Sequence, residues 1–277
     1  MKAPRNTRAR LIEIGNAEDD AIDLAPTALI VAATERPGVS LDPYRRHLEQ
    51  LASDVREYAQ GGELDNLDFQ IEALVQVIIR RYGYAGSDAV FDDLDAANLM
   101  RVIDHRSGLP VAIGILFIAT ARAQGWQATG LDFPGRFLVR FEAGGQCKII
   151  DPFGGGEVDA PAMRGMFKAI AGNHVELTPE HYRDMGNRDI LLRLQGNIKA
   201  RLLQRGRFDD AAEVIETMLL FAPNQTDLWR EAGLLHARLD HINDAIRALE
   251  EHMRRTGTED KQYKTSVLLQ ELRTRLN

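Results

Sequence analysis

The stretch "FPGRFLVRFEAGGQCKIIDPFGGG", residues 133–156, holds the signals that decide the fold. Two short runs rich in β-branched and aromatic residues flank a glycine turn, which predicts two antiparallel strands. The second strand ends at Asp151, just before a Pro-Phe-Gly exit. An acid at a strand end, beside a polar residue of the neighbouring strand, is typical of a catalytic dyad. The residue at the partner position is Arg136, whose guanidinium cannot accept a proton at physiological pH.

Two registers are open for this hairpin. A turn centred on Ala143 and Gly144 places Arg136 directly opposite Asp151, whereas a loop of Gly144 and Gly145 makes them diagonal neighbours. Either register keeps both side chains on one face of the sheet, so we expect an ion pair. Such a pair forms either a polar cleft at the strand end or a salt bridge on the rim, and the sequence favours the rim.

The residues before the hairpin predict helices within 24–38, 41–62, 67–86 and 94–108, the last of them closed by Gly108. The run after Pro110 is apolar on nearly every side up to Gly125, so this helix is expected to be enclosed by other elements. A further strand is expected at 126–133. The predicted fold is α+β, a mostly helical domain with a small antiparallel sheet against a buried central helix.

The C-terminal third has a different character, because strand signals vanish after Asp189 and amphipathic helices follow one another. An offset of 34 residues places "RGRFDDAAEVIETML" (205–219) on "LDHINDAIRALEEHM" (239–253). This period predicts tetratricopeptide-like helical units; an ordinary helical bundle with an accidental match is the alternative. The expected organisation is a flexible arm at 1–23, a first domain at 24–165, a linker at 166–187 and an all-α domain at 188–277.

The composition narrows the classes of function. A net charge of −7 and a pI near 5.6 argue against a nucleic-acid partner. The single cysteine, Cys147, excludes an internal disulfide and a multi-cysteine zinc site. The longest apolar run, 109–121, is too short to cross a membrane, and the first twenty residues lack the apolar core of a signal peptide. A cytoplasmic protein is expected.

Few side chains qualify as nucleophiles or ligands. Cys147 shares the face of Asp151 but lies four residues away, about 13 Å along a strand, with no histidine on either strand to activate it. Ser107 suits a loop or capping position. His105 is expected to pack in a turn. The histidines are scattered, the glycines at 154–156 lack the Lys-Ser/Thr of a phosphate loop, and no acidic segment has calcium-loop spacing. No metal and no cofactor are expected.

These segments together resemble a known family. The sequences "VIDHRSGLPVAIGILFIATARAQGW", "DFPGRFLVRF" and "KIIDPFGGG", in this order and spacing, are similar to the core of the SirB1-type bacterial proteins. These proteins are a branch of the transglutaminase-like superfamily. The helical segments from Leu24 to the core resemble the N-terminal part of that family. The segment from Asn187 onward resembles its tetratricopeptide-like C-terminal part.

The resemblance implies a papain/transglutaminase-like core and a defined set of site positions. Catalytic members of the superfamily place a cysteine at the N-terminus of the central helix, a histidine on the next strand and an aspartate on the strand after. These positions fall here on Pro110 (with Ala112 as the limit of a sliding alignment), Arg136 and Asp151. Only the acid is retained, so the resemblance implies a degenerate triad.

We therefore expect a non-catalytic module for protein interaction or regulation. Its partner is expected to be a protein or peptide bound through the C-terminal repeats, with no nucleic acid and no membrane; the oligomeric state is left open. The alternative is a cysteine- or serine-dependent amidase, peptidase or transamidase with a non-standard site, using Cys147 or Ser107 beside Asp151.

Overall fold

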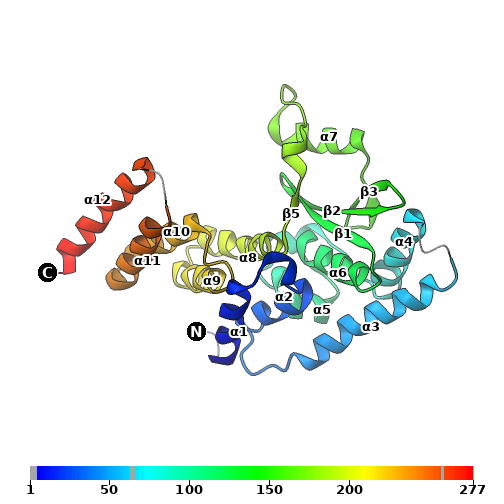
Figure 1. Cartoon of the computed structure of the whole chain (residues 1–277), viewed down its shortest axis with the longest axis horizontal. Coiled ribbons are helices and arrows are strands. Elements are labelled where there is room, and N and C mark those ends of the chain that lie inside the picture. Colours follow the sequence, from blue (N-terminus) through cyan, green and yellow to red (C-terminus); the bar gives the residue numbers. More distant parts are fainter. Residues whose placement is uncertain (1–4, 63–65, 257–258, 277) are drawn as a thin grey trace. The chain divides into compact units, whose positions relative to one another are not determined.

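The computed structural model describes residues 5–62, 66–256 and 259–276, and most of them are helical (Figure 1). The chain forms two compact units. The first is Glu18–Leu194, and the second joins the segment ending at Ala17 to the one beginning at Gln195. The predicted class is confirmed: helices and a small antiparallel sheet come first, and an all-helical part follows.

The first unit contains seven α-helices or parts of them among its described residues. They are α2 (Leu24–Ala32), α3 (Asp42–Ala59), α4 (Leu67–Leu74), α5 (Leu99–His105), α6 (Pro110–Arg122), α7 (Ala160–Ala171) and the start of α8 (Asn187–Gln204). Helix α4 continues as a π-helix, Val75–Arg81. Short 3-10 turns occur at Asp19–Ala21, Asp88–Phe91, Asp95–Ala97 and Pro179–Tyr182.

The sheet has five strands in the order β4-β3-β2-β1-β5, with every neighbouring pair antiparallel. The strands are β1 (Gln127–Phe133), β2 (Arg136–Ala143), β3 (Gln146–Asp151), β4 (Gly156–Glu157) and β5 (Arg183–Met185). The three long strands agree with the sequence. Strands β4 and β5 are too short to show alternation, and β5, like the end of α7, lies in the segment expected to be a linker.

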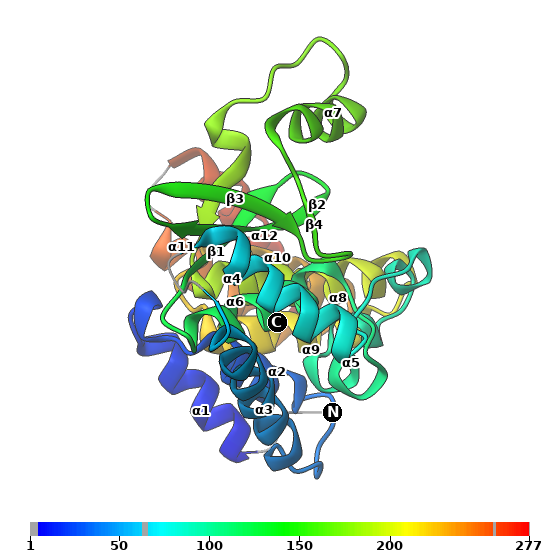
Figure 2. The same cartoon turned by 90° about the vertical axis from the view of Figure 1, so that its right-hand side faces the viewer.

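Helices α6 and α7 cover opposite faces of this sheet (Figures 1 and 2). Every residue of α6 from Val111 to Ile118 is buried, which confirms the predicted enclosed helix. The helix approaches β2 closely at Gly114, where a Cβ atom would lie 2.4 Å from the ring of Phe137. On the other face, Met163 and Phe167 of α7 pack with Leu131, Phe133 and Leu138 of the sheet.

The second unit consists of helix pairs with a common turn. Its elements are α1 (Arg5–Asn16), the end of α8, α9 (Phe208–Phe221), α10 (Thr226–Arg238), α11 (Ile242–Arg255) and α12 (Glu259–Leu276). Gly206 and Asp240, which the 34-residue offset aligns, both have positive φ, 71° and 61°. Ala211 and Ala245, aligned in the same way, are both fully buried. The predicted repeat is thus present in the structure.

The N-terminal segment differs from the expected flexible arm. Arg5–Asn16 form α1, whose Leu11 is fully buried, and Gly15 packs against the backbone of Leu220 in α9. The apolar residues of this segment are too few to show a helical period, and its packing partner lies about two hundred residues away in the sequence.

Two other boundaries, one of a domain and one of a helix, also differ from the prediction. Helix α8 is continuous, and its residues Ile190, Leu191 and Leu194 are buried within the first unit, so that unit extends past the predicted boundary at 165. Helix α5 ends at His105, before the expected Gly108, because Arg106 adopts the left-handed conformation (φ 57°). Within the described ranges, the structure has no helix with both the length and the apolarity needed to span a bilayer.

Candidate functional site

The hairpin of β2 and β3 adopts the second of the two predicted registers. Ala143 pairs with Gln146, so Gly144 and Gly145 form the loop. Both glycines have positive φ, 58° and 77°, as the tight turns of two-residue hairpins require. Arg136 is therefore a diagonal neighbour of Asp151, and its Nη1 donates to Oδ2 at 2.6 Å. The predicted ion pair is confirmed.

Asp151 also shapes the turn that follows it. Its Oδ1 accepts a hydrogen bond from the backbone N–H of Phe153 at 3.0 Å, and its carbonyl accepts from the N–H of Gly155 at 2.9 Å. Both carboxylate oxygens are thus used, one by a permanent cation and one by the backbone. Asp151 is mostly buried and Arg136 is 47% exposed, so the guanidinium presents the accessible charge.

The two positions that the resemblance assigns to the nucleophile, Pro110 and Ala112, lie in a different layer. Pro110 is the first residue of α6, and Ala112 is fully buried. Successive residues of a strand face opposite sides, and Phe137 faces α6 whereas Leu138 packs with α7. Alternation therefore assigns Arg136 and Asp151 to the α7 face. The structure brings the arginine and the acid together, but assigns them to the face of the sheet opposite α6.

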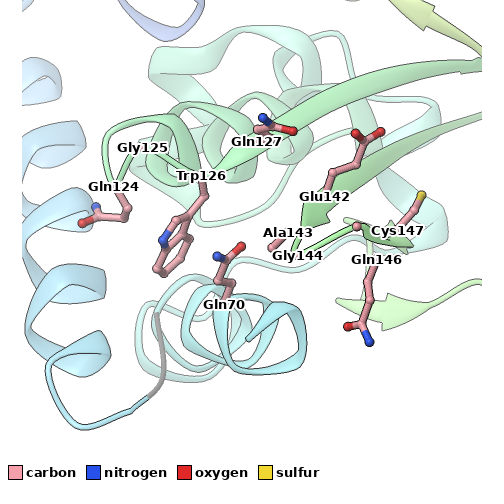
Figure 3. Close-up of a pocket in the computed structure, with 11 residues that line it drawn as sticks. Gln70, Gln124, Gly125, Trp126, Gln127, Glu142, Ala143, Gly144, Gln146 and Cys147 are labelled. Carbon is pink, nitrogen blue, oxygen red and sulfur yellow. The ribbon is translucent and has the colours of Figure 1, made fainter. Parts of the chain in front are cut away.

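Cys147 lies near the start of β3, opposite Glu142. It lines a hollow of about 790 Å³ together with Trp126, Gln70, Gln127 and Gln146, and its sulfur points away from Trp126 and Gln70 (Figure 3). Neither Arg136 nor Asp151 lines this hollow. Partial desolvation raises the pKa of the thiol, the carboxylates of Glu142 and Asp184 raise it further, and Arg140 opposes them. The thiolate is therefore disfavoured.

A second polar cluster joins His47 of α3 to Tyr84 and Arg106. His47 Nε2 lies 2.7 Å from the Tyr84 hydroxyl and 2.7 Å from Nη1 of Arg106, which also donates to that hydroxyl. Burial, and then the charge of Arg106, lower the pKa of His47 to about 4, so its ring is neutral at physiological pH. Burial also raises the pKa of Tyr84. His105, the residue before Arg106, is the histidine that the sequence singles out in this region, but it is exposed.

The cluster continues to a buried carboxylate. Asp54, 3% exposed, accepts from the Tyr82 hydroxyl and from Gln50 Nε2, each at 2.7 Å, with Arg81 3.4 Å away. Burial alone would raise the pKa of Asp54, but the hydrogen bonds from Tyr82 and Gln50 outweigh it and lower the pKa. The ring of Tyr82 meets His47 edge-on at 5.3 Å. Each ionisable member has its partners, which is typical of a structural network.

Acid should weaken the fold through His47. The unfolded chain binds a proton at this ring near its ordinary pKa of 6.5, whereas the folded ring stays neutral down to about pH 4. Protons therefore favour the unfolded state over this window, and the free energy of unfolding should fall by about 2 kcal/mol between pH 7 and pH 4, after allowance for solvent screening. Urea unfolding of the wild type and of His47→Gln at both pH values measures the part of this fall that is due to His47.

The variant His47→Gln keeps an acceptor for Arg106 but cannot titrate, so it should lose this part of the acid sensitivity. His105→Gln, which changes an exposed ring on the nearby α5, should keep it. Equal acid sensitivity in the wild type and in His47→Gln would contradict the assignment.

Two protein-family models match successive parts of the chain. Residues 42–196 match the family model described as transglutaminase-like superfamily, and residues 198–275 match a tetratricopeptide repeat model. A UPF0162 protein of Xylella fastidiosa (strain Temecula1) is 26% identical over 248 residues, which cover 87% of this chain and 86% of the relative.

Two further relatives are similar over shorter lengths. Protein SirB1 of Salmonella typhimurium is 26% identical over 194 residues, 70% of this chain and 71% of the relative. The UPF0162 protein YchA of Escherichia coli (strain K12) is 27% identical over 222 residues, 80% and 81% of the two chains. The resemblance to SirB1-type proteins is thereby confirmed.

Proposed function

Because the chain belongs to the transglutaminase-like superfamily, whose model spans residues 42–196, we propose that it is a non-catalytic member acting in protein interaction or regulation. The observation that carries this proposal is the ion pair of Arg136 and Asp151. An arginine at the position of the catalytic histidine stays protonated and cannot serve as a general base.

The remaining triad positions support the same proposal. Pro110 and Ala112 carry no nucleophilic atom, and α6 and the Arg136–Asp151 pair occupy opposite faces of the sheet. The Asp151 carboxylate, which in a triad would orient an imidazole, is held by Arg136 and by the turn after β3. The pair therefore holds the strand end in place, and no proton can be passed along it.

A binding role is supported by the second unit. Tetratricopeptide arrays present extended surfaces on which peptides dock. Helices α8 and α10 are neighbours, joined by an ion pair between Lys199 and Glu231. Leu203 on α8, Leu234 on α10 and Val267 on α12 are large apolar side chains that are about 40% exposed. We propose that the exposed apolar side chains of α8 and α10, which are neighbours, are the centre of the surface that takes a protein or peptide partner.

The alternative is a cysteine- or serine-dependent amidase, peptidase or transamidase. The observation in its favour is that Cys147, the only thiol of the chain, lines a hollow large enough for a peptide side chain. Against it stand the raised pKa of that thiol and the lack of a histidine among the residues that line the hollow. Ser107 follows Arg106, which likewise cannot act as a base.

An activity assay separates the two functions. The wild type and Cys147→Ser, both full length, are tested for amide hydrolysis and for amine incorporation into a glutamine peptide. We expect no turnover above the buffer rate in either protein, because the surroundings of the thiol raise its pKa and so disfavour the thiolate. Turnover by the wild type that is lost in Cys147→Ser would overturn the proposal and establish the enzyme.

Capture of a partner then tests the surface. Full-length wild type, Leu234→Glu and Val39→Glu serve as baits under gentle crosslinking, since Val39 is a similarly exposed apolar residue of the first unit. A defined partner should be recovered with the wild type and with Val39→Glu, and at least tenfold less with Leu234→Glu. Recovery of no partner by any bait, or equal recovery by all three, would count against the proposed surface.

A further inference from the structure

The turn between α10 and α11 gathers two histidines and an aspartate. His236 lies in the last turn of α10, His241 directly precedes α11, and Asp244 lies in the first turn of α11. One imidazole nitrogen of each histidine and one carboxylate oxygen of Asp244 all lie within 4.8 Å of one another. His236 is 5% exposed and His241 is exposed, so the cluster reaches from the core of the unit to solvent.

The buried histidine has an unused nitrogen. Nε2 of His236 lies 3.3 Å from Oε1 of Glu216 on α9. A neutral imidazole beside a carboxylate keeps its proton on the nitrogen that faces the carboxylate, which leaves the lone pair on the other nitrogen. That nitrogen, Nδ1, is buried and has no hydrogen-bond partner within the described part of the chain. A buried acceptor without a donor costs stability unless something binds it.

The preceding repeat shows that this turn does not need a histidine. The 34-residue offset aligns His236 with Leu202 and His241 with Arg207. The backbone is the same in both turns: the N–H of Arg207 donates to the carbonyl of Leu202 at 2.9 Å, and that of His241 to His236 at 2.9 Å. Leu202 is 3% exposed and fills the position with carbon alone.

The third aligned position sharpens this contrast. Asp244 corresponds to Asp210, which in the earlier turn pairs with Arg207 at 2.6 Å. In the later turn a histidine replaces that arginine, so a permanent cation beside the aspartate has given way to a side chain that can offer a nitrogen lone pair. Asp244 Oδ1 accepts from Arg247 at 2.6 Å, which leaves Oδ2 for another partner.

We propose that His236, His241 and Asp244 bind one divalent transition-metal ion of the zinc class. A site with two imidazoles and one carboxylate suits ions of the zinc class, whereas magnesium and calcium prefer sites made of oxygen ligands alone. Glu216 orients the buried ring, as outer carboxylates do at histidine–zinc sites. In a tetrahedral zinc site the ligand atoms are roughly 3.4 Å apart, so the three side chains would draw closer together when the ion binds. Water fills the remaining position.

The sequence gives no sign of this cluster. His236 and His241 are five residues apart, a spacing that does not place two side chains on one helix face. The intervening left-handed Asp240 reverses the chain and brings them together, with their ring centroids 5.8 Å apart.

Binding of the metal alone tests the proposal. Full-length protein treated with a chelator is titrated with Co²⁺, followed by its visible absorption, and with Zn²⁺ by calorimetry. We expect one ion per chain with a dissociation constant in the micromolar range or below, and a rise in Tm of several degrees with Zn²⁺. His236→Leu, which copies the residue of the other turn, should keep the fold and weaken binding at least a hundredfold.

Two further variants and a control make the result specific. His241→Ala and Asp244→Asn change exposed or partly exposed residues and should each weaken binding at least tenfold, whereas His174→Ala, an exposed residue of the first unit, should not change it. Without metal, His236→Leu should melt no lower than the wild type. The proposal is overturned if the wild type binds no stoichiometric ion, or if its binding survives His236→Leu and His241→Ala unchanged.

Discussion

Gly15→Ala should lower the free energy of unfolding by about 2–3 kcal/mol, because a methyl group at this position has no room. A Cβ atom on Gly15 would lie 2.3 Å from the carbonyl oxygen of Leu220 and 3.1 Å from the ring of Pro223. The obstacle is backbone of α9, which cannot rotate away as a side chain does. Helix α1 must therefore shift, and the burial of Leu11 is lost with it.

A matched control, Gly196→Ala, should change the free energy of unfolding in the opposite direction. Gly196 lies inside α8, and apart from the adjacent backbone of that helix no described atom lies within 4 Å of the place that a Cβ atom would take. Gly196→Ala should therefore raise the free energy of unfolding by about 0.5–1 kcal/mol through helix propensity alone. Urea unfolding measures both variants, and hydrogen exchange of the amides of α1 locates the effect. A stable Gly15→Ala protein with protected α1 amides would show that α1 does not pack on α9.

Asn187→Ala should cost about 2–4 kcal/mol, because it removes three hydrogen bonds made by one buried side-chain amide. Asn187 is 7% exposed at the start of α8. Its Oδ1 accepts from Arg122 Nη1 at 2.6 Å, and its Nδ2 donates to the carbonyls of Asp19 and Ile22, both at 3.1 Å. One amide thus joins the segment before α2 to the central helix.

The variant Asn187→Asp tells the two kinds of contact apart. It keeps an oxygen for Arg122 but replaces the donor group with a second oxygen that faces two carbonyls. It also adds a negative charge beside Asp19, whose carboxylate already accepts from the N–H groups of residues 187 and 188. We expect it to be at least as unstable as Asn187→Ala in the same urea measurement. Wild-type stability of Asn187→Asp would mean that the two donor contacts contribute nothing.

The parts of the fold that could be predicted are those with a local cause. The apolar run after Pro110 can only be buried, and the paired glycines at 144 and 145 can only be a turn, so the central helix and the hairpin follow from the sequence. The choice of register does not, because Ala143–Gly144 and Gly144–Gly145 are both acceptable turns. The packing of the sheet decides between them.

What the sequence could not show depends on contacts between distant residues. Strand β5 is three residues long and is defined by its pairing with β1. The role of Arg106 depends on a left-handed backbone that glycine usually adopts, and on Tyr84 and His47, which come from other segments. The proposed loss of a catalytic base could be predicted from the sequence, because it depends on the chemistry of one residue, Arg136, whatever surrounds it.

The division of the second unit between the two ends of the chain has a consequence for synthesis on the ribosome. Helix α1 emerges before α9, which packs on it and follows only after the whole first unit has been made. At roughly 5–20 residues per second, the roughly 190 residues between them take about 10–40 seconds to translate. Throughout that interval the apolar side of α1 waits in the nascent chain without its partner. We expect a chaperone that binds short apolar segments to bind α1 during this interval.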